Sequence, residues 1–229
     1  MGLFLLIAIG LLSFVVQWRF KSKFKTYSEI GLSSGLSGRE VAEKMLADHG
    51  ISDVEIISVE GQLTDHYNPQ NKTVNLSPEV YHGKSVASAA VAAHECGHAV
   101  QHAKAYSWLQ FRSAMVPVVS VASNLIQWTL FIGVLLFAFA RIPFVLEIGV
   151  AALALVTLFS FITLPVEFDA SRRALAWLNA SGGTITDATE HDQAKDALWW
   201  AAMTYVVAAL GSLATLVYYA SMLMGNRRD

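Results

Sequence analysis

Residues 116–140 (VPVVSVASNLIQWTLFIGVLLFAFA) and 142–164 (IPFVLEIGVAALALVTLFSFITL) are two apolar runs joined by Arg141, with Pro143 close behind. A helix crosses the hydrocarbon core of a bilayer in roughly 20 residues, so each run is long enough to span it. We therefore expect residues 116–164 to form a transmembrane hairpin.

Two further apolar segments have the length of a membrane span. Residues 1–18 (MGLFLLIAIGLLSFVVQW) are followed by four cations, whereas a cleavable signal peptide would carry its charge before the apolar run. This segment is predicted to be a retained anchor, and residues 198–224 supply the fourth span. The composition agrees, because 54% of the 229 residues are hydrophobic and only 15% are charged. The expected fold is mainly α, a membrane helical bundle of about four transmembrane helices.

The stretch 25–112 carries ordinary charge and turn signals, and we expect it to be the first part of a folded, water-facing domain. Residues 165–197 are expected to be the second part. Ser37 with Glu40 predicts a capping box that opens a helix, and Gly50 predicts its left-handed stop. The domain is therefore split in the sequence by the hairpin.

The rest of the first part is predicted to contain two short strands and one long helix. Alternation in VEIISV from Val54 indicates a strand, and a loop separates it from a second strand at Thr73–Leu76. The Ser-Pro pair at 77–78 is a good N-cap and first turn for the Ala-rich run 85–103, which we expect to be helical.

Residues 94–98 of this helix read HECGH, so His94 and His98 lie four residues apart on one face and can reach the same ion. Zinc binds nitrogen or oxygen donors at about 2.0 to 2.2 Å, and lowers the pKa of a bound water toward about 7. Glu95 can take the proton from that water. The competing interpretation is a helix whose histidines pack or hydrogen-bond without a metal.

A catalytic zinc site needs a third protein ligand. His102 does not qualify, because it lies about 12 Å of helical rise beyond His94. The metzincin extension is also absent, since Gln101 and Lys104 stand where a Gly and a His would be required. The third ligand must come from a distant part of the chain.

Glu167 follows the third span and would lie on the same membrane face as the HECGH helix. A carboxylate so close to an apolar span is costly without a cation, which favours a role as a metal ligand. The alternative is an interfacial carboxylate paired with Arg172 or Arg173. Asp169 is the second candidate ligand, or an acceptor that orients a ligating histidine.

Counting crossings places both parts of the domain on one side of the membrane and both termini on the other. The positive-inside rule assigns the side richer in Lys and Arg to the cytoplasm. The domain side has Arg19, Lys21, Lys23, Lys25, Arg112, Arg172 and Arg173, and the opposite side has Arg141, Arg227 and Arg228. The rule predicts a cell-membrane protein whose active site faces the cytoplasm, although Arg227 and Arg228 weigh against it.

With these residues in place, the chain resembles the neutral zinc metallopeptidases of the YugP type, and more distantly the HtpX and CAAX-prenyl protease group. The likeness extends over nearly the whole chain. The runs that carry it are SGREVAEKML, DHYNP, TVNLSPEVYHGKSVAS, HECGH, EFDASRRAL and TYVVAAL.

The resemblance implies a gluzincin with a small α+β zincin-like domain, in which His94, His98 and Glu167 bind one zinc ion and Glu95 is the general base. In the HtpX-like group an Asp four residues after the ligand Glu steadies a ligating histidine. Here that position is Ser171, and Asp169 is the open alternative.

Two further features have two interpretations each, and a third has one. The TVNLS strand is either an exposed edge that binds substrate by backbone pairing or an ordinary packed strand. His66 in the DHYNP loop could polarise the scissile carbonyl, yet a lone loop histidine is more often solvated. Cys96, the only cysteine, is most simply a packing residue, and it can form no internal disulfide.

The sequence thus predicts an integral-membrane zinc metalloendopeptidase that acts on peptides or proteins, among them membrane proteins. The alternative is a non-proteolytic membrane scaffold or chaperone that keeps zinc for structure. A formal net charge of -2 with no basic stripe excludes a nucleic-acid partner. Sequence alone does not define the oligomeric state.

Overall fold

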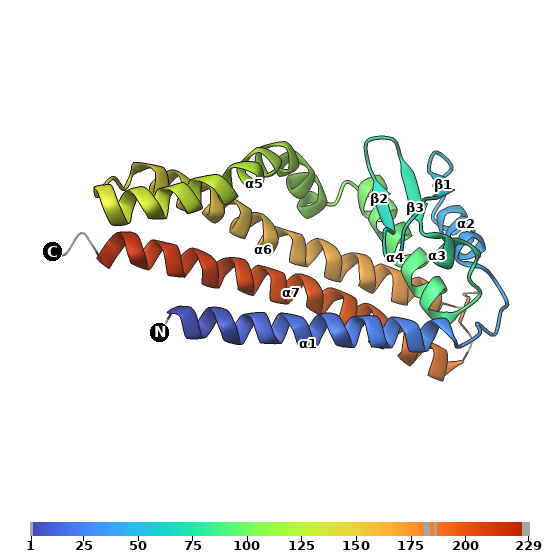
Figure 1. The fold of residues 1–229 in the computed structure, drawn as a ribbon. Coiled ribbons are helices and arrows are strands. Elements are labelled where there is room, and N and C mark those ends of the chain that lie inside the picture. The colour runs from blue at the N-terminus through green and yellow to red at the C-terminus, as the bar shows by residue number, and fades with distance from the viewer. Residues whose placement is uncertain (1, 181–183, 186, 226–229) are drawn as a thin grey trace. The chain divides into compact units, whose positions relative to one another are not determined.

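The computed structural model describes residues 2–180, 184–185 and 187–225, and it is mainly helical with one small sheet (Figure 1). Arg227 and Arg228, used in the charge count above, lie outside the described residues. The elements run α1 (Gly2–Ser28), α2 (Gly38–Asp48), β1 (Glu55–Ser58), β2 (His66–Asn68), β3 (Thr73–Leu76), α3 (Pro78–His82), α4 (Val86–Ala103), α5 (Ser107–Ala140), α6 (Phe144–Leu178) and α7 (Ala188–Gly225).

Four of these helices, α1, α5, α6 and α7, are long and apolar enough to cross a membrane, as the sequence predicts. Each continues beyond the apolar run that identifies it. The third span is predicted to end at residue 164, whereas α6 runs through Pro165 to Leu178. Charged side chains mark where a helix leaves hydrocarbon, but they do not end its hydrogen bonding, so α6 carries Glu167 within a continuous helix.

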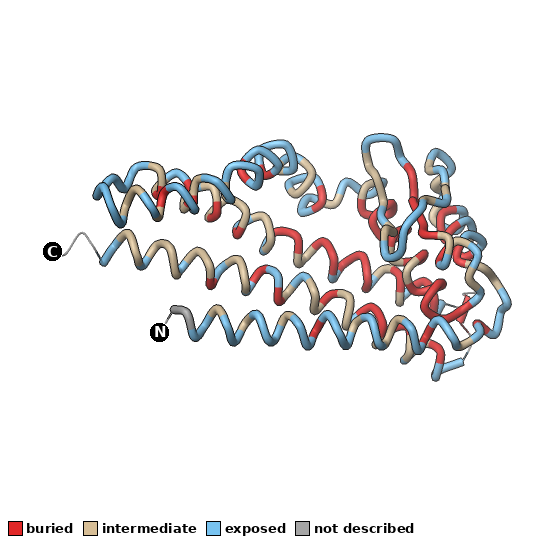
Figure 2. The backbone as a smooth tube through the Cα atoms, in the orientation of Figure 1, coloured by how far each residue is buried: buried red, intermediate tan, exposed pale blue. Residues whose placement is uncertain are grey.

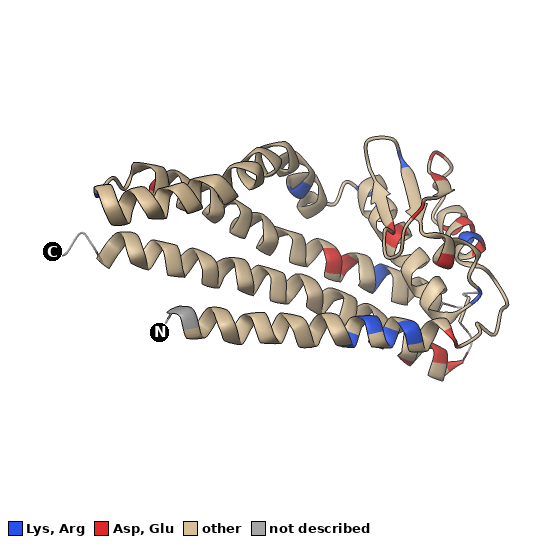
Figure 3. Cartoon of the chain, in the orientation of Figure 1, with Lys and Arg blue, Asp and Glu red and all other residues tan. Residues whose placement is uncertain are grey.

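The chain divides into two compact units. The first, called here the membrane unit, comprises Met1–Val16, Phe111–Leu164 and Thr204–Asp229. Its described residues include only three charged ones, Arg112, Arg141 and Glu147 (Figure 3). Within this unit α5 and α6 approach closely at two glycines, since a Cβ at Gly133 would lie 2.7 Å from the Leu146 backbone, and Gly149 faces Leu130.

The second, called the catalytic unit, comprises Gln17–Gln110 and Pro165–Met203. Its core combines α2, α3, α4 and β3 with the end of α6 and the start of α7, and α4 is buried along most of its length (Figure 2). Strand β1 pairs in parallel with β3, and β2 pairs antiparallel with β3, so the order is β1-β3-β2. The TVNLS strand is therefore the central, fully buried strand, and its interpretation as a free edge is wrong.

The predicted helix caps and stops in the catalytic unit are confirmed with one exception. Ser37 and Glu40 form the reciprocal capping box of α2, and Gly50 has the positive φ of 68° that a left-handed stop requires. Ser77 does not cap the long helix. It precedes the short helix α3 and bonds Asp65, while Ser85 caps α4 by accepting from the backbone N–H of Ser88 at 3.1 Å.

Candidate metal centre

Helix α4 presents His94 and His98 on one face, one turn apart. Their rings meet edge to face with centroids 4.8 Å apart, and the His98 side chain is buried. Because Ser85 fixes the start of the helix, the register of both imidazoles follows directly from the sequence. The two Nε2 atoms face the same point.

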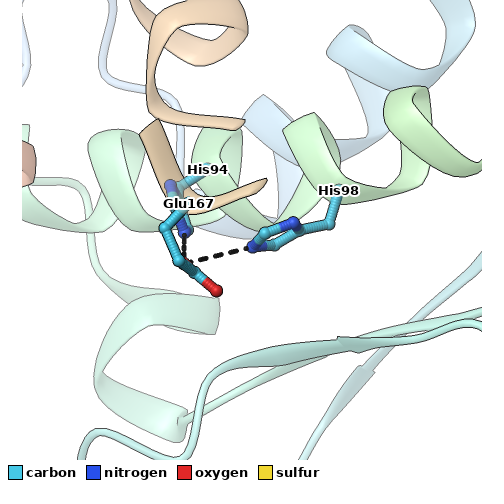
Figure 4. Close-up of side chains that lie close together, drawn as sticks. All are labelled: His94, His98 and Glu167. Atoms are coloured by element: carbon cyan, nitrogen blue, oxygen red, sulfur yellow. Dashed lines mark ion pairs between the residues drawn. The ribbon is translucent and has the colours of Figure 1, made fainter. Parts of the chain in front are cut away.

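Glu167 reaches this point from α6 (Figure 4). Its Oε2 lies 3.3 Å from Nε2 of His94 and 3.5 Å from Nε2 of His98, and the residue is only 2% exposed. The same oxygen is buried and has no hydrogen-bond partner among the described residues. The donor atoms of the three residues all lie within 4.8 Å of one another. Two nitrogens and an orphaned carboxylate oxygen form a donor set that suits zinc.

Asp169, the alternative third ligand, already has hydrogen-bond and ion-pair partners. Asp169 accepts hydrogen bonds from Gln101 at 2.9 Å and Arg173 at 2.5 Å, and it also pairs with Arg172. The arginines therefore neutralise Asp169 and not Glu167. No charged partner other than the two histidines faces the Glu167 carboxylate in the ion pairs of the described residues.

A close crossing of α4 and α6 allows Glu167 to reach the histidines. A Cβ at Gly97 would lie 2.6 Å from the carbonyl oxygen of Ala170, which real side chains do not tolerate. Ala170 and Ala174 are fully buried, so small residues line this contact on both helices. The glycine inside HECGH is thus required by packing, and Glu167 lies one turn before the crossing.

Each histidine has a hydrogen-bond partner at its other ring nitrogen. Ser171 Oγ lies 3.1 Å from Nδ1 of His94, and Gln101 Oε1 lies 3.0 Å from Nδ1 of His98. When Nδ1–H donates to these oxygens, Nε2 is left with a free lone pair for a metal. Ser171 and Asp169, the two candidates for steadying a ligating histidine, therefore both contribute. Ser171 contacts His94 directly, and Asp169 holds the amide of Gln101, which contacts His98.

Gln101 was not singled out from the sequence as a site residue. Its signal was its position, since it lies three residues after His98 on the same helix face, and an amide there can hold Nδ1. Its side chain is completely buried, and its Nε2 also donates to the Val166 carbonyl at 2.8 Å. Gln101 therefore joins the histidine helix to α6 on both sides of Glu167.

Glu95 points from α4 toward the sheet. It is 7% exposed, and its Oε2 accepts a hydrogen bond of 2.9 Å from the backbone N–H of Tyr67 in β2. Burial raises the pKa of the Glu95 carboxyl above its ordinary value. Burial alone would lower the pKa of His98, but the charge of Glu167 outweighs it and raises that pKa to about 9 in the metal-free site.

Strand β2 was predicted as a loop, and it is an edge strand of the sheet. The N–H of Tyr67 points to Glu95 and away from β3, so the unpaired side of β2 faces the general-base candidate. The Tyr67 hydroxyl lies 2.7 Å from Nδ1 of His102, which places that histidine in a structural contact outside the metal centre. His66 is exposed, with Nδ1 2.7 Å from the Thr64 carbonyl.

A membrane protein with a zinc site is the class that this fold and donor set indicate, and the comparisons agree. The chain belongs to the family described as "Putative neutral zinc metallopeptidase", which matches residues 2–224. It is similar to the "Putative membrane protease YugP" of Bacillus subtilis (strain 168), with 40% identity over 227 residues that cover 99% of this chain and 98% of the relative. No solved structure matches the chain. Zinc is therefore the expected metal, and a protease role in a membrane is supported.

Proposed function

We propose that this chain is an integral-membrane zinc endopeptidase in which His94, His98 and Glu167 hold one zinc ion and Glu95 is the general base. The observation that carries the proposal is the buried Oε2 of Glu167, which accepts no hydrogen bond and faces two Nε2 atoms. An isolated buried carboxylate oxygen costs several kcal/mol unless a cation neutralises it. When bound, zinc polarises a carbonyl oxygen and lowers the pKa of a water molecule toward about 7.

The protein's own residues then move the proton. Glu95, with a pKa raised by burial, accepts a proton from the attacking water and delivers it to the leaving amine. The backbone N–H of Tyr67 fixes the orientation of the carboxylate through Oε2. Ser171 and Gln101 keep the imidazoles in the tautomer that leaves Nε2 free.

The edge of β2 is the best place for an extended peptide. An unpaired strand edge can bind a peptide through backbone hydrogen bonds, and this edge adjoins Glu95. The central strand β3 cannot do so, because both of its edges are paired. Substrate would therefore align along β2, with the scissile bond beside Glu95.

The domain limits and membrane side belong to the same proposal. The catalytic domain would combine residues 25–112 and 165–197, between an anchor at 1–18, a hairpin at 116–164 and a last span at 198–224. Under the positive-inside rule, the cations of α1 at positions 19, 21, 23 and 25 support a cytoplasmic position for this domain.

The decisive experiment replaces Glu95 by Gln in the full chain and measures both bound zinc and cleavage of a casein-like protein. The variant should keep its zinc and lose cleavage, whereas Glu43→Gln, an exposed change on α2, should leave both unchanged. Glu167→Ala should lose most of the zinc. Equal cleavage by the Glu95→Gln and unaltered chains would refute the mechanism, and zinc without turnover in the unaltered chain would favour the non-proteolytic scaffold.

A further inference from the structure

One face of α5 in the membrane unit carries polar side chains toward the outside. Ser120, Asn124 and Gln127 are all exposed, and Phe131, 63% exposed, continues the same face. Asn124 lies about 12 Å along the helix from Val116, which is well inside a hydrocarbon core about 30 Å thick. This set, Ser120, Asn124, Gln127 and Phe131, is called the α5 amide face.

The two amides differ from the threonines of the membrane unit. Thr129, Thr157 and Thr215 bond carbonyls of their own helices, and Thr157 also bonds Ser212 at 2.6 Å. Within the described part of the chain, Asn124 and Gln127 have no such partner. A primary amide that faces lipid tails has nothing to bond, so a protein partner is the way to satisfy it.

The spacing of the amide face shows what shape of partner fits. Its members follow one another at intervals of four, three and four residues, the repeat that keeps a seam straight along a pair of supercoiled helices. The opposite face of α5, with Ala122 and Leu130, is buried against the rest of the unit. The amide face is therefore free to receive another membrane helix.

We propose that the α5 amide face is the contact surface between two copies of this chain in the membrane. Two copies inserted in the same direction can pair about an axis along the membrane normal, which makes their α5 helices parallel and places each residue beside its own counterpart. An amide is both donor and acceptor, so Asn124 and Gln127 each match their own copies at the same depth. Any other helix would need a polar group at both depths.

The test measures self-association of the full chain, labelled through a C-terminal tag with donor or acceptor dyes, in phosphatidylcholine vesicles at increasing lipid dilution. The dissociation constant should rise about thirtyfold in the double variant Asn124→Leu with Gln127→Leu, because two interhelical amide pairs are lost. Leu is compatible with lipid, so zinc content should not change. Val118→Ala with Leu125→Ala, two exposed positions off the face, is the matched control and should leave association unchanged.

Disulfide cross-linking gives an independent measurement. Cys96 is completely buried, so a cysteine placed in α5 is the reactive one. Asn124→Cys should cross-link to its own copy in the vesicles, and Val118→Cys should not. A chain that stays monomeric at the lowest dilution, equal cross-linking at both positions, or association that the double Leu variant does not weaken would each overturn the proposal. A monomeric chain whose amide face instead binds a substrate's membrane helix would overturn it as well.

Discussion

Adding one methyl group at Gly97 should open the metal centre. A Cβ there would lie 2.6 Å from the Ala170 carbonyl oxygen, and ordinary contact begins at 3.4 Å, so α4 and α6 must separate by about 1 Å at this crossing. Glu167 lies one turn before Ala170 on α6 and would move with it. Zinc ligands tolerate errors of only about 0.2 Å, so the carboxylate could no longer bond the same ion as both histidines.

We expect Gly97→Ala to weaken zinc binding about 10- to 100-fold and to destabilise the fold by about 1 to 3 kcal/mol, the usual cost of overpacking. Competition with a chromogenic chelator measures the first, and thermal unfolding of the metal-free chain measures the second. Gly211→Ala is the matched control. Its Cβ would meet only Ile9, at an ordinary 3.6 Å, so it should gain up to about 1 kcal/mol of helix propensity and keep its zinc.

Both variants replace a helical Gly by Ala, so the difference between their zinc affinities measures the effect of the α4–α6 crossing alone. If Gly97→Ala binds zinc within about twofold of the unaltered chain, the close approach of α4 and α6 does not position Glu167, and the packing argument fails. A loss of zinc equal in both variants would refute it too.

Three further predictions follow from the contacts around the site. Gln101→Leu should lower zinc affinity about tenfold or more by removing the acceptor at Nδ1 of His98, and the exposed change Gln110→Leu should have no effect in the same chelator competition. Tyr67→Pro removes the N–H that donates to Glu95, so kcat should fall about tenfold while zinc is retained. Tyr67→Ala keeps that N–H, so its kcat should fall less. Equal losses of kcat in the two variants would exclude a role for this hydrogen bond. Because the pKa of His98 is raised to about 9, the protonated imidazole stabilises the metal-free fold fully below pH 6.5, and this stabilisation is lost as the pH rises toward about 9. Thermal unfolding of chelator-treated protein should therefore show stability that falls across this window, while zinc affinity rises. A stability that does not change with pH would contradict the charge assignment.

Residue patterns predicted the parts of this protein whose signals are local. The apolar runs located four helices, the Ser37–Glu40 box located α2, and HECGH located the two imidazoles. Each depends on neighbours within one or two turns. Proximity of Glu167 to the histidines was also predictable, because the cost of a carboxylate at the end of an apolar span requires a cation nearby.

Features that depend on contacts between distant segments could not be predicted from local sequence patterns. The three residues of β2 are a strand only because β3 lies beside them, and the sequence HYNP alone indicates a loop. Likewise β3 reads as a possible edge until its neighbours on both sides are known. The role of Gln101 depends on α6 passing over α4, a crossing that the sequence marks only by the small residues Gly97 and Ala170.

The catalytic unit is held together by residues from both ends of the chain. Glu190 accepts hydrogen bonds from the backbone and hydroxyl of Ser33, and Asp196 bonds Tyr27 at 2.6 Å and pairs with Lys23. Translation delivers these acidic partners last. A nascent polypeptide that has reached the end of α6 already contains every proposed zinc ligand. It still lacks Glu190 and Asp196, whose contacts hold the start of the unit. We therefore expect this unit to fold completely only once the start of α7 has been synthesised.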